Sequence, residues 1–192
     1  MVFSLPSGRA IRARCIAAGL LAASIIAGPG SATSDLLAPW VASAPPPLAL
    51  ADLTGVARDL GGEQDRTVLV HFFATWCEPC VPELAALERF RVRTDSMSLT
   101  ILAVSVGESP ARLHRFFADR PVGFPILLDP ERVATRDWQV GVLPSTFILA
   151  PGLRPRLLAE GDVDWDSIDP AGLADRGADA PSKHSNRSGG IR

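Results

Sequence analysis

The chain has 192 residues, of which 47% are hydrophobic, enough for a single domain with a buried core. Its net charge is −2, and removing residues 1–32 leaves 16 basic and 21 acidic residues, a net charge of −5. A mildly acidic body lacks the basic patch that nucleic-acid binding requires, so we expect no nucleic-acid partner.

Residues 1–32 have the pattern of an export signal. Three arginines precede an apolar run over residues 15–28, which is shorter than the ~20 residues of a membrane span. Small residues offer cleavage after Ala32 or Ala44. The segment is also compatible with an uncleaved membrane anchor. In both cases we predict that the body lies in the periplasm or on the outer face of the cytoplasmic membrane, where disulfides persist.

The composition divides the rest of the chain into three parts. Residues 33–47 end in three prolines and are predicted to form a stiff, extended linker. Residues 48–168 carry the alternating apolar segments of a folded domain. Residues 169–192 are rich in glycine, alanine, serine and charge, which predicts a disordered tail.

Hydrophobic patterning predicts the elements of the domain in order. A short β-hairpin over residues 48–60 precedes a strand over 67–73, whose nearly continuous apolar run indicates burial on both faces. Prolines at positions 79, 82 and 110 are typical of first helical turns. The remaining elements are a helix from about 80 to 90, a strand over 99–106, a helix from 110, a strand over 124–128, a short helix over 129–138 and a hairpin of strands over 141–150 and 156–160. This order predicts an α/β fold, with helices on both faces of a mixed central sheet.

The sequence Cys77-Glu78-Pro79-Cys80 lies where the strand over 67–73 gives way to a helix. Free N–H groups and the positive dipole end at a helix start stabilise an anion. A thiolate at Cys77 is such an anion, so we expect its pKa to fall below the free value of about 8.5. Cys80, one turn further along, is predicted to be more buried and to resolve a mixed disulfide. The pair is therefore suited to thiol–disulfide exchange.

A zinc site is the main alternative for two cysteines at this spacing. Structural zinc sites use four ligands, usually from two such pairs. The only other candidate ligands are Cys15, which belongs to the export signal, His71, His114 and His184. With no second pair, the pattern favours redox chemistry, and we expect no metal and no cofactor beyond a redox-active disulfide.

The sequence Trp76-Cys77-Glu78-Pro79-Cys80 after an apolar strand resembles the active site of the thioredoxin superfamily, and residues 141–147 resemble its cis-proline loop. The resemblance covers about residues 48–168. It implies a thioredoxin-like three-layer fold, and a cis Leu143–Pro144 bond that packs against the two sulfurs. The gap of 64 residues from Cys80 to Pro144 holds an extra strand and helix, an insertion that is similar to the TlpA/ResA-like branch.

Members of that branch reduce disulfides outside the cytoplasm, above all in apocytochrome c before haem attachment, with electrons from a membrane thiol transporter of the DsbD/CcdA kind. The resemblance therefore implies a reductant that works in cytochrome c maturation. Cys77 would be the exposed nucleophile, Cys80 the resolving thiol and Glu83 an acid beside the site. The residues implied in substrate binding are Trp76, Glu78, Pro79, Leu143 and Pro144.

Two side chains near the motif allow two interpretations each. A carboxylate at Glu83 can disfavour the thiolate and relay its proton, or it can be an ordinary acid favoured by the dipole of a first helical turn. His71 occupies the strand position where thioredoxins carry a buried acid. It could accept a proton near pH 7, although its apolar neighbours favour a core residue.

Two other functions are alternatives to the oxidoreductase hypothesis. A Sco-like copper-handling or oxidase copper-site assembly protein needs two thiolates and a histidine, but no histidine lies between His114 and His184 to supply the usual ligand. A peroxiredoxin-like peroxidase needs a threonine or serine hydroxyl and an arginine around one peroxidatic cysteine, and the motif does not supply that pattern. Both are weaker than the oxidoreductase hypothesis.

Overall fold

The computed structural model describes residues 37–95 and 97–175. The predicted signal over residues 1–32 and the last part of the predicted tail lie outside the described residues. Within the described ranges, no helix has both the length and the apolar character needed to cross a membrane.

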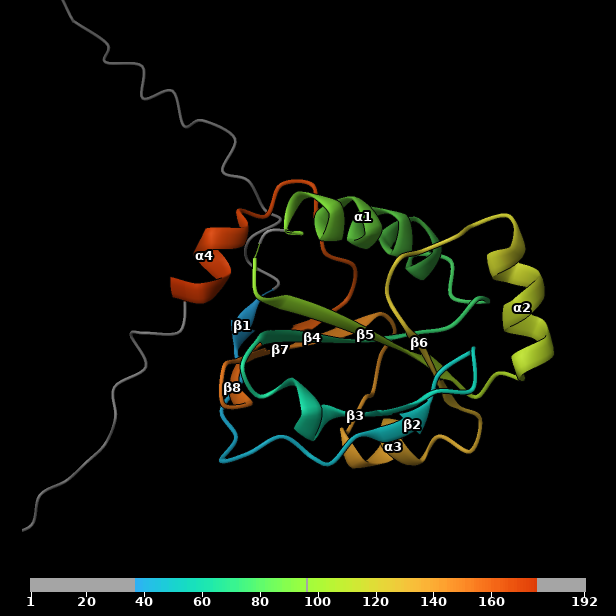
Figure 1. Ribbon diagram of the computed structural model, residues 1–192, viewed down its shortest axis with the longest axis horizontal. Coiled ribbons are helices and arrows are strands. Elements are labelled where there is room, and N and C mark those ends of the chain that lie inside the picture. Colours follow the sequence, from blue (N-terminus) through green and yellow to red (C-terminus); the bar gives the residue numbers. More distant parts are fainter. Residues whose placement is uncertain (1–36, 96, 176–192) are drawn as a thin grey trace, which may run out of the picture. The chain divides into compact units, whose positions relative to one another are not determined.

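A mixed sheet forms the centre of the fold (Figure 1). Its central strand, β4 (Thr67–Phe73), is buried along nearly its whole length, as its continuous apolar run predicts. In spatial order, the six strands are β1 (Ala38–Pro39), β8 (Arg154–Glu160), β7 (Ser145–Ala150), β4, β5 (Leu99–Val106) and β6 (Ile126–Asp129). The β4–β5 and β5–β6 pairs are parallel, whereas β7 runs antiparallel to β4 and β8. Parallel strands end at one edge, so the loops after β4, β5 and β6 meet there.

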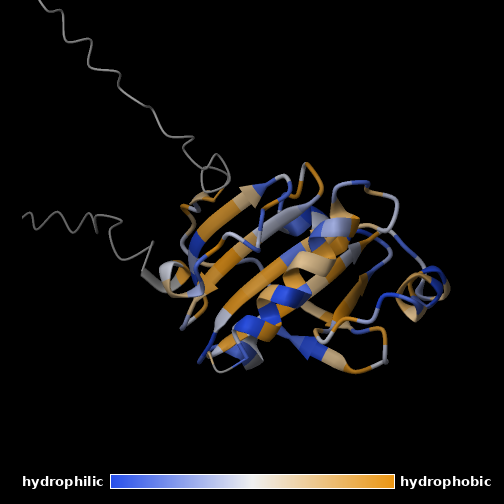
Figure 2. Cartoon of the chain, turned by 90° about the horizontal axis from the view of Figure 1, so that it is seen from above, coloured by the Kyte–Doolittle hydropathy of each residue, from blue (hydrophilic) through white to orange (hydrophobic). Residues whose placement is uncertain are grey.

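Helices cover both faces of this sheet. On one face, α1 (Cys80–Arg93) and α2 (Pro110–Ala118) contribute to a core cluster with Leu69 and Phe73 of β4. On the other face lie α3 (Val133–Asp137), the hairpin of β2 (Ala49–Ala51) and β3 (Ala57–Asp59), and the 3-10 helix η2 (Leu60–Glu63). The central strands are largely hydrophobic (Figure 2). The predicted fold class, an α/β thioredoxin-like fold with an N-terminal β-hairpin, is confirmed.

The short helix after β6 begins later than predicted. The sequence placed it over residues 129–138, whereas α3 begins at Val133. The reason is the buried carboxylate of Asp129, which accepts hydrogen bonds from the N–H groups of Ala134 and Thr135 at 3.3 and 2.8 Å. The acid at the end of β6 thus caps the helix from a distance, and residues 130–132 form the turn between them.

The predicted linker and tail contain structure that the composition did not indicate. Within the linker, Ala38–Pro39 pair with Leu157 and Leu158 of β8. Within the tail, Pro170–Asp175 form the helix α4, whose Leu173 is 2% exposed and belongs to the core cluster of α1. The prediction of disorder was therefore wrong for residues 170–175, because a single leucine in a small, polar stretch gives no periodic signal.

Candidate active site

The two cysteines of the motif are joined by a disulfide, with Cα atoms 5.3 Å apart. Cys77 lies in the loop after β4, and Cys80 is the first residue of α1. The backbone N–H of Cys77 donates to the carbonyl of Ala74, and that of Cys80 to the carbonyl of Cys77, at 3.2 Å each. The main chain therefore turns tightly between strand and helix, which brings both sulfurs to the start of α1.

The two sulfurs differ in access from the outside. Cys80 is completely buried, whereas Cys77 is 6% exposed and borders a groove of about 570 Å³. The groove is lined by residues of the motif, the end of β5, the turn after β6, α3 and the proline loop: Trp76, Cys77, Glu78, Pro79, Val106, Arg132, Thr135, Val140, Gly141, Val142 and Leu143. A molecule in the groove therefore meets Cys77 first.

The loop before β7 contributes its own wall of this groove. The Leu143–Pro144 peptide bond is cis, and Pro144 is buried while Leu143 is half-buried. The carbonyl of Pro144 accepts a hydrogen bond from the N–H of Gly161 at 2.8 Å, and Ser145 Oγ donates to the carbonyl of Val142 at 2.8 Å. These bonds fix the loop whose apolar side chains, including the 45% exposed Val142, face the groove.

The start of α1 is electrostatically suited to a thiolate. Its N-cap residue, Pro79, makes no side-chain hydrogen bond to the helix. The positive end of the helix dipole therefore acts on the neighbouring sulfurs without a competing side-chain cap.

Glu83 lies one helical turn after Cys80 and is only 3% exposed. Its Oε1 accepts hydrogen bonds from Trp165 Nε1 at 2.7 Å and from the N–H of Val163 at 3.2 Å. Its buried Oε2 has no partner among the described residues. Burial raises the pKa of Glu83 to about 7, partly opposed by these two hydrogen bonds, and the charge of Asp162 raises it further. Glu83 is thus a buried titratable group next to the disulfide, unlike a solvated first-turn acid.

His71 is a core residue of β4. It is completely buried, its Nδ1 lies 2.9 Å from Thr146 Oγ1, and its ring stacks near Phe73 with centroids 6.2 Å apart. Burial lowers the pKa of His71 to about 3, so the imidazole is neutral near pH 7. Its Nε2 is buried without a partner among the described residues. Of the two interpretations left open by the sequence, the structure supports the core residue.

Sequence reasoning missed the group that holds the active-site loop. Glu108, after β5, is 4% exposed, and its carboxylate accepts hydrogen bonds from the N–H and Oγ1 of Thr75 at 2.8 and 2.5 Å. Ser105 Oγ also donates to it at 3.0 Å, and Arg112 Nε pairs with it at 2.9 Å. Thr75 lies two residues before Cys77. The signal in the sequence was an acid two residues after a buried strand.

Arg132 is a second missed residue of the groove. Its φ of 55° lies in the left-handed region that side chains rarely adopt. A Cβ at Gly107 would lie 2.5 Å from its Nε, so the glycine leaves room for the guanidinium above the end of β5. Arg132 therefore adds a positive charge to a groove that is otherwise largely apolar.

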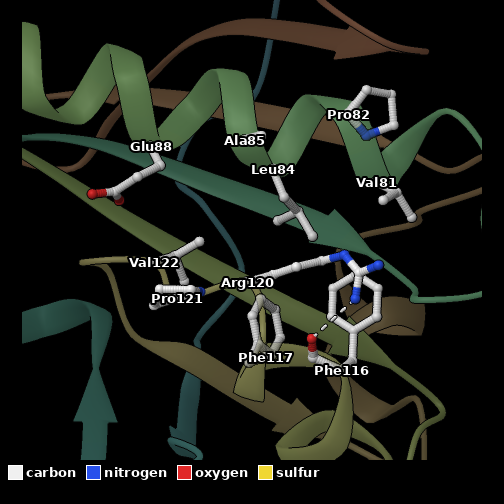
Figure 3. Close-up of a pocket in the computed structure, with 10 residues that line it drawn as sticks. All are labelled: Val81, Pro82, Leu84, Ala85, Glu88, Phe116, Phe117, Arg120, Pro121 and Val122. Atoms are coloured by element: carbon white, nitrogen blue, oxygen red, sulfur yellow. Dashed lines mark hydrogen bonds between the residues drawn. The ribbon is translucent and has the colours of Figure 1, made fainter.

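A separate hollow lies between α1 and α2 (Figure 3). It measures about 400 Å³ and borders Val81 and Pro82, which follow Cys80, but neither cysteine lines it. The guanidinium of Arg120 lies over the ring of Phe116, 4.9 Å from its centroid. Of these two hollows, the groove and not this one is lined by Cys77.

Metal ligands do not gather in the described part of the chain, where no group of three or more histidine, cysteine, aspartate or glutamate side chains could hold an ion. His114 is exposed on α2, away from the buried His71 of β4. The third histidine of the sequence, His184, lies outside the described residues.

Comparisons with known proteins agree with this geometry. A family model described as the AhpC/TSA family matches residues 42–153. A curated relative, the thiol-disulfide oxidoreductase ResA of Bacillus subtilis, is 34% identical over 106 residues, which are 55% of this chain and 59% of that protein. The protein of that name from Geobacillus thermodenitrificans is 28% identical over 128 residues, or 67% and 74% of the two chains. The chain thus spans about three fifths of the length of the first relative.

A solved structure supports the fold. The secreted thiol-disulfide isomerase of Corynebacterium glutamicum superposes with a TM-score of 0.63 at 20% identity, and the match covers 76% of this chain and 96% of that one.

Proposed function

Because the chain belongs to the AhpC/TSA family, and because a buried cysteine pair opens on a groove in a thioredoxin-like fold, we propose that it is an extracytoplasmic thiol–disulfide oxidoreductase that reduces disulfides in partner proteins. The observation that carries this proposal is the asymmetry of the pair. Cys77 borders the groove, while Cys80 is sealed beneath it at the start of α1.

In the first step, the Cys77 thiolate of the reduced protein attacks one sulfur of a partner disulfide. The partner's S–S bond breaks, one partner sulfur leaves as a thiolate, and the other forms a mixed disulfide with Cys77. The partner's main chain lies in the groove between the motif and the proline loop, where Trp76, Glu78, Pro79 and Leu143 contact it.

In the second step, Cys80 loses its proton and attacks the sulfur of Cys77. The Cys77–Cys80 disulfide forms, and the partner's second sulfur leaves as a thiolate, so the partner gains two electrons and takes up its protons from solvent. Glu83, whose pKa of about 7 leaves it partly ionised near neutral pH, accepts the proton of Cys80. A donor dithiol then reduces the disulfide again.

The proposed setting combines the sequence with the relatives. The export pattern of residues 1–32 and the secreted structural relative support a location in the periplasm or on the outer face of the cytoplasmic membrane. The relatives named ResA support the TlpA/ResA-like assignment. Within that setting we propose an apocytochrome c-like disulfide as substrate, and a membrane thiol transporter of the DsbD/CcdA kind as electron donor.

A peroxidase is the second candidate, because one observation favours it. Arg112 Nε donates to Thr75 Oγ1 at 2.8 Å, so a hydroxyl and an arginine meet two residues before Cys77 in the chain. Both groups, however, are already bound to the carboxylate of Glu108. Consumption of hydrogen peroxide faster than reduction of a protein disulfide would favour the peroxidase.

The proposed function is tested by the two cysteine variants. Cys80→Ser should trap mixed disulfides with a protein substrate, while Cys77→Ser should lose disulfide reduction altogether; an active Cys77→Ser protein would refute the assignment. Equilibration against thiol buffers gives the reduction potential. A reductant should lie nearer about −270 mV than about −120 mV.

A further inference from the structure

We propose that Trp165 is a positioning residue for the active site, because its indole N–H orients Glu83 and keeps that carboxyl able to exchange a proton with the cysteine pair. This inference rests on the proposed function. It goes further in that the residue that orients Glu83 lies in the loop over residues 161–169. This loop lies beyond the region matched by the family model.

Trp165 is held as firmly as any side chain of the core. It is completely buried, and its ring lies against Phe90 of α1 with centroids 5.3 Å apart. Its Nε1–H donates to Glu83 Oε1 at 2.7 Å, and the N–H of Val163 in the same loop donates to the same oxygen at 3.2 Å. One loop thus supplies both donors that Glu83 has among the described residues, and both reach one oxygen.

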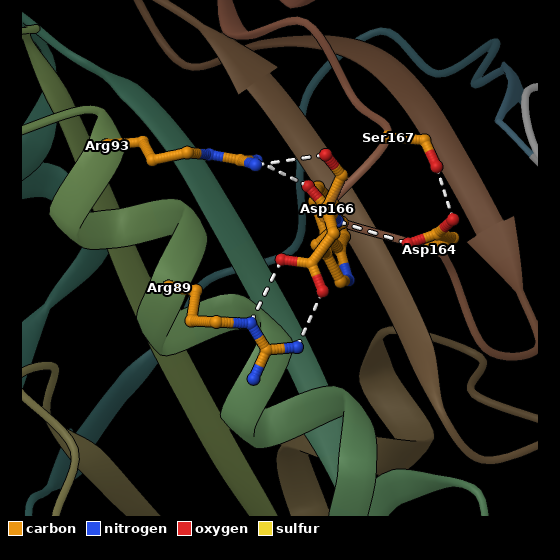
Figure 4. Close-up of polar contacts among 6 residues, drawn as sticks. Arg89, Arg93, Asp164, Asp166 and Ser167 are labelled. Carbon is orange, nitrogen blue, oxygen red and sulfur yellow. Dashed lines mark hydrogen bonds and ion pairs between the residues drawn. The ribbon is translucent and has the colours of Figure 1, made fainter.

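Two arginines of α1 bind the loop to that helix through hydrogen bonds (Figure 4). Arg93 donates to the carbonyls of Trp165 and Asp166 at 2.6 and 2.9 Å. Arg89 donates through Nε and Nη2 to the carboxylate of Asp166 at 3.0 and 2.6 Å. Because α1 also carries Cys80 and Glu83, these hydrogen bonds fix the indole relative to both residues.

The asymmetry of the carboxyl indicates a function beyond packing. Oε1 accepts both hydrogen bonds, whereas Oε2 is buried without a partner among the described residues. Under this proposal, proton exchange therefore takes place at Oε2, while the indole holds Oε1. Hydrogen bonds to an ionised carboxylate favour its charged form, so the indole opposes the effect of burial.

Other titratable groups lie around Glu83, and the test must separate them. They are Asp162 of the same loop, the Cys80 thiol one turn earlier on α1, and His71 on the strand face that α1 covers. Loss of the indole N–H changes none of these charges. A shift in the Glu83 titration on its loss therefore reports the hydrogen bond itself.

The experiment uses the full-length reduced protein and the variant Trp165→Phe, which keeps an aromatic ring but removes the donor. The rate of alkylation of Cys77 by iodoacetamide is followed by mass spectrometry between pH 5 and 9. The inflection in this pH profile that disappears in Glu83→Gln is assigned to the titration of Glu83 and is called the Glu83 step. In Trp165→Phe this step should move upward by about one pH unit, and adding Trp165→Phe to Glu83→Gln should cause no further change.

The chain offers a matched control in Trp138. It is also buried, at 3% exposure, and its Nε1–H also donates to an oxygen, the carbonyl of Pro47, but it packs on the other face of the sheet. Trp138→Phe should leave the Glu83 step in place. Equal steps in Trp165→Phe and the wild type, or no Glu83-dependent step at all, would overturn the proposal.

A direct titration separates failure of this proposal from failure of the proposed function. The side-chain carboxyl carbon of Glu83 is followed by NMR in the oxidised protein, where no cysteine reacts. A higher midpoint in Trp165→Phe supports the positioning role even if the wild type reduces no disulfide, and an unchanged midpoint overturns that role even if it does. Should Trp165→Phe not fold, the exposed Arg93→Gln variant loosens the same loop and should shift the midpoint in the same direction.

Discussion

Glu83 and His71 are both buried, yet burial displaces their pKa values in opposite directions. Removal from water disfavours the charged form of each, so the pKa of the carboxyl rises to about 7 and that of the imidazole falls to about 3. Near neutral pH, His71 therefore stays uncharged while Glu83 changes its charge. In the proposed mechanism, the proton acceptor is therefore the acid on α1 and not the histidine on β4.

We predict that the free energy of unfolding of the wild type falls as the pH rises, and that Glu83→Gln removes this fall. The pKa of Glu83 is about 7 in the folded protein against an ordinary 4.5, so its contribution is fully present below pH 4.5 and is lost as the pH rises through 7. This loss amounts to about 3 kcal/mol. Urea unfolding of the oxidised proteins should show that the unfolding free energy of the variant, relative to that of the wild type, increases from pH 5 to pH 8. A constant difference between the two proteins would contradict the expectation.

His71→Asn should act at the acid end of the pH range. The pKa of His71 is about 3 when folded against an ordinary 6.5, so its contribution is fully present above pH 6.5 and is lost as the pH falls toward 3. Asparagine does not titrate and can still bond to Thr146. An acid titration followed by circular dichroism should place the unfolding midpoint of the variant at a lower pH, and a midpoint at higher pH would count against this account.

At the scale of elements, the site depends on how the loop after β5 holds the loop after β4. Three side chains and one backbone N–H converge on the carboxylate of Glu108, which is nearly inaccessible to water. Removing its charge leaves buried donors without an equal acceptor. The active-site loop is therefore positioned by strand pairing on one side and by this carboxylate on the other.

We expect Glu108→Gln to lower the unfolding free energy by about 2 kcal/mol and to slow disulfide reduction. The control is Glu131→Gln, since Glu131 is exposed in the turn after β6 and no ion pair of its side chain is described. Chemical unfolding and a disulfide-reduction assay on both variants provide the comparison. Equal results for the two would show that Glu108 does not hold the loop.

The sequence predicted most elements but few of the contacts between them. Strand β4 and the starts of α1 and α2 follow from local patterns, because a continuous apolar run and prolines in the first turn are read from neighbouring residues. The bond from Thr75 to Glu108 spans 33 residues, and that from Trp165 to Glu83 spans 82. Such pairs become visible only once the strand register and the return of the loop onto α1 are known.

At the scale of the whole molecule, the C-terminal helix completes the core over α1. We predict that Leu173→Ala lowers stability by about 2–4 kcal/mol, because this side chain is 2% exposed in the main cluster. Val41→Ala, at a side chain that is 95% exposed, is the control and should be close to neutral. Thermal unfolding measures both, and equal midpoints would mean that α4 is not needed for the fold.

Both edges of the central sheet are partly covered, and this affects how the protein meets other chains. On one edge, the short β1 covers β8 and includes Pro39, which has no N–H to offer a further strand. On the other, the N–H of Leu53 bonds to the carbonyl of Ile126 of β6. Copies of the fold therefore have little opportunity to join strand to strand into aggregates. Under the proposed function, an extended segment of a partner protein docks in the groove beside Cys77.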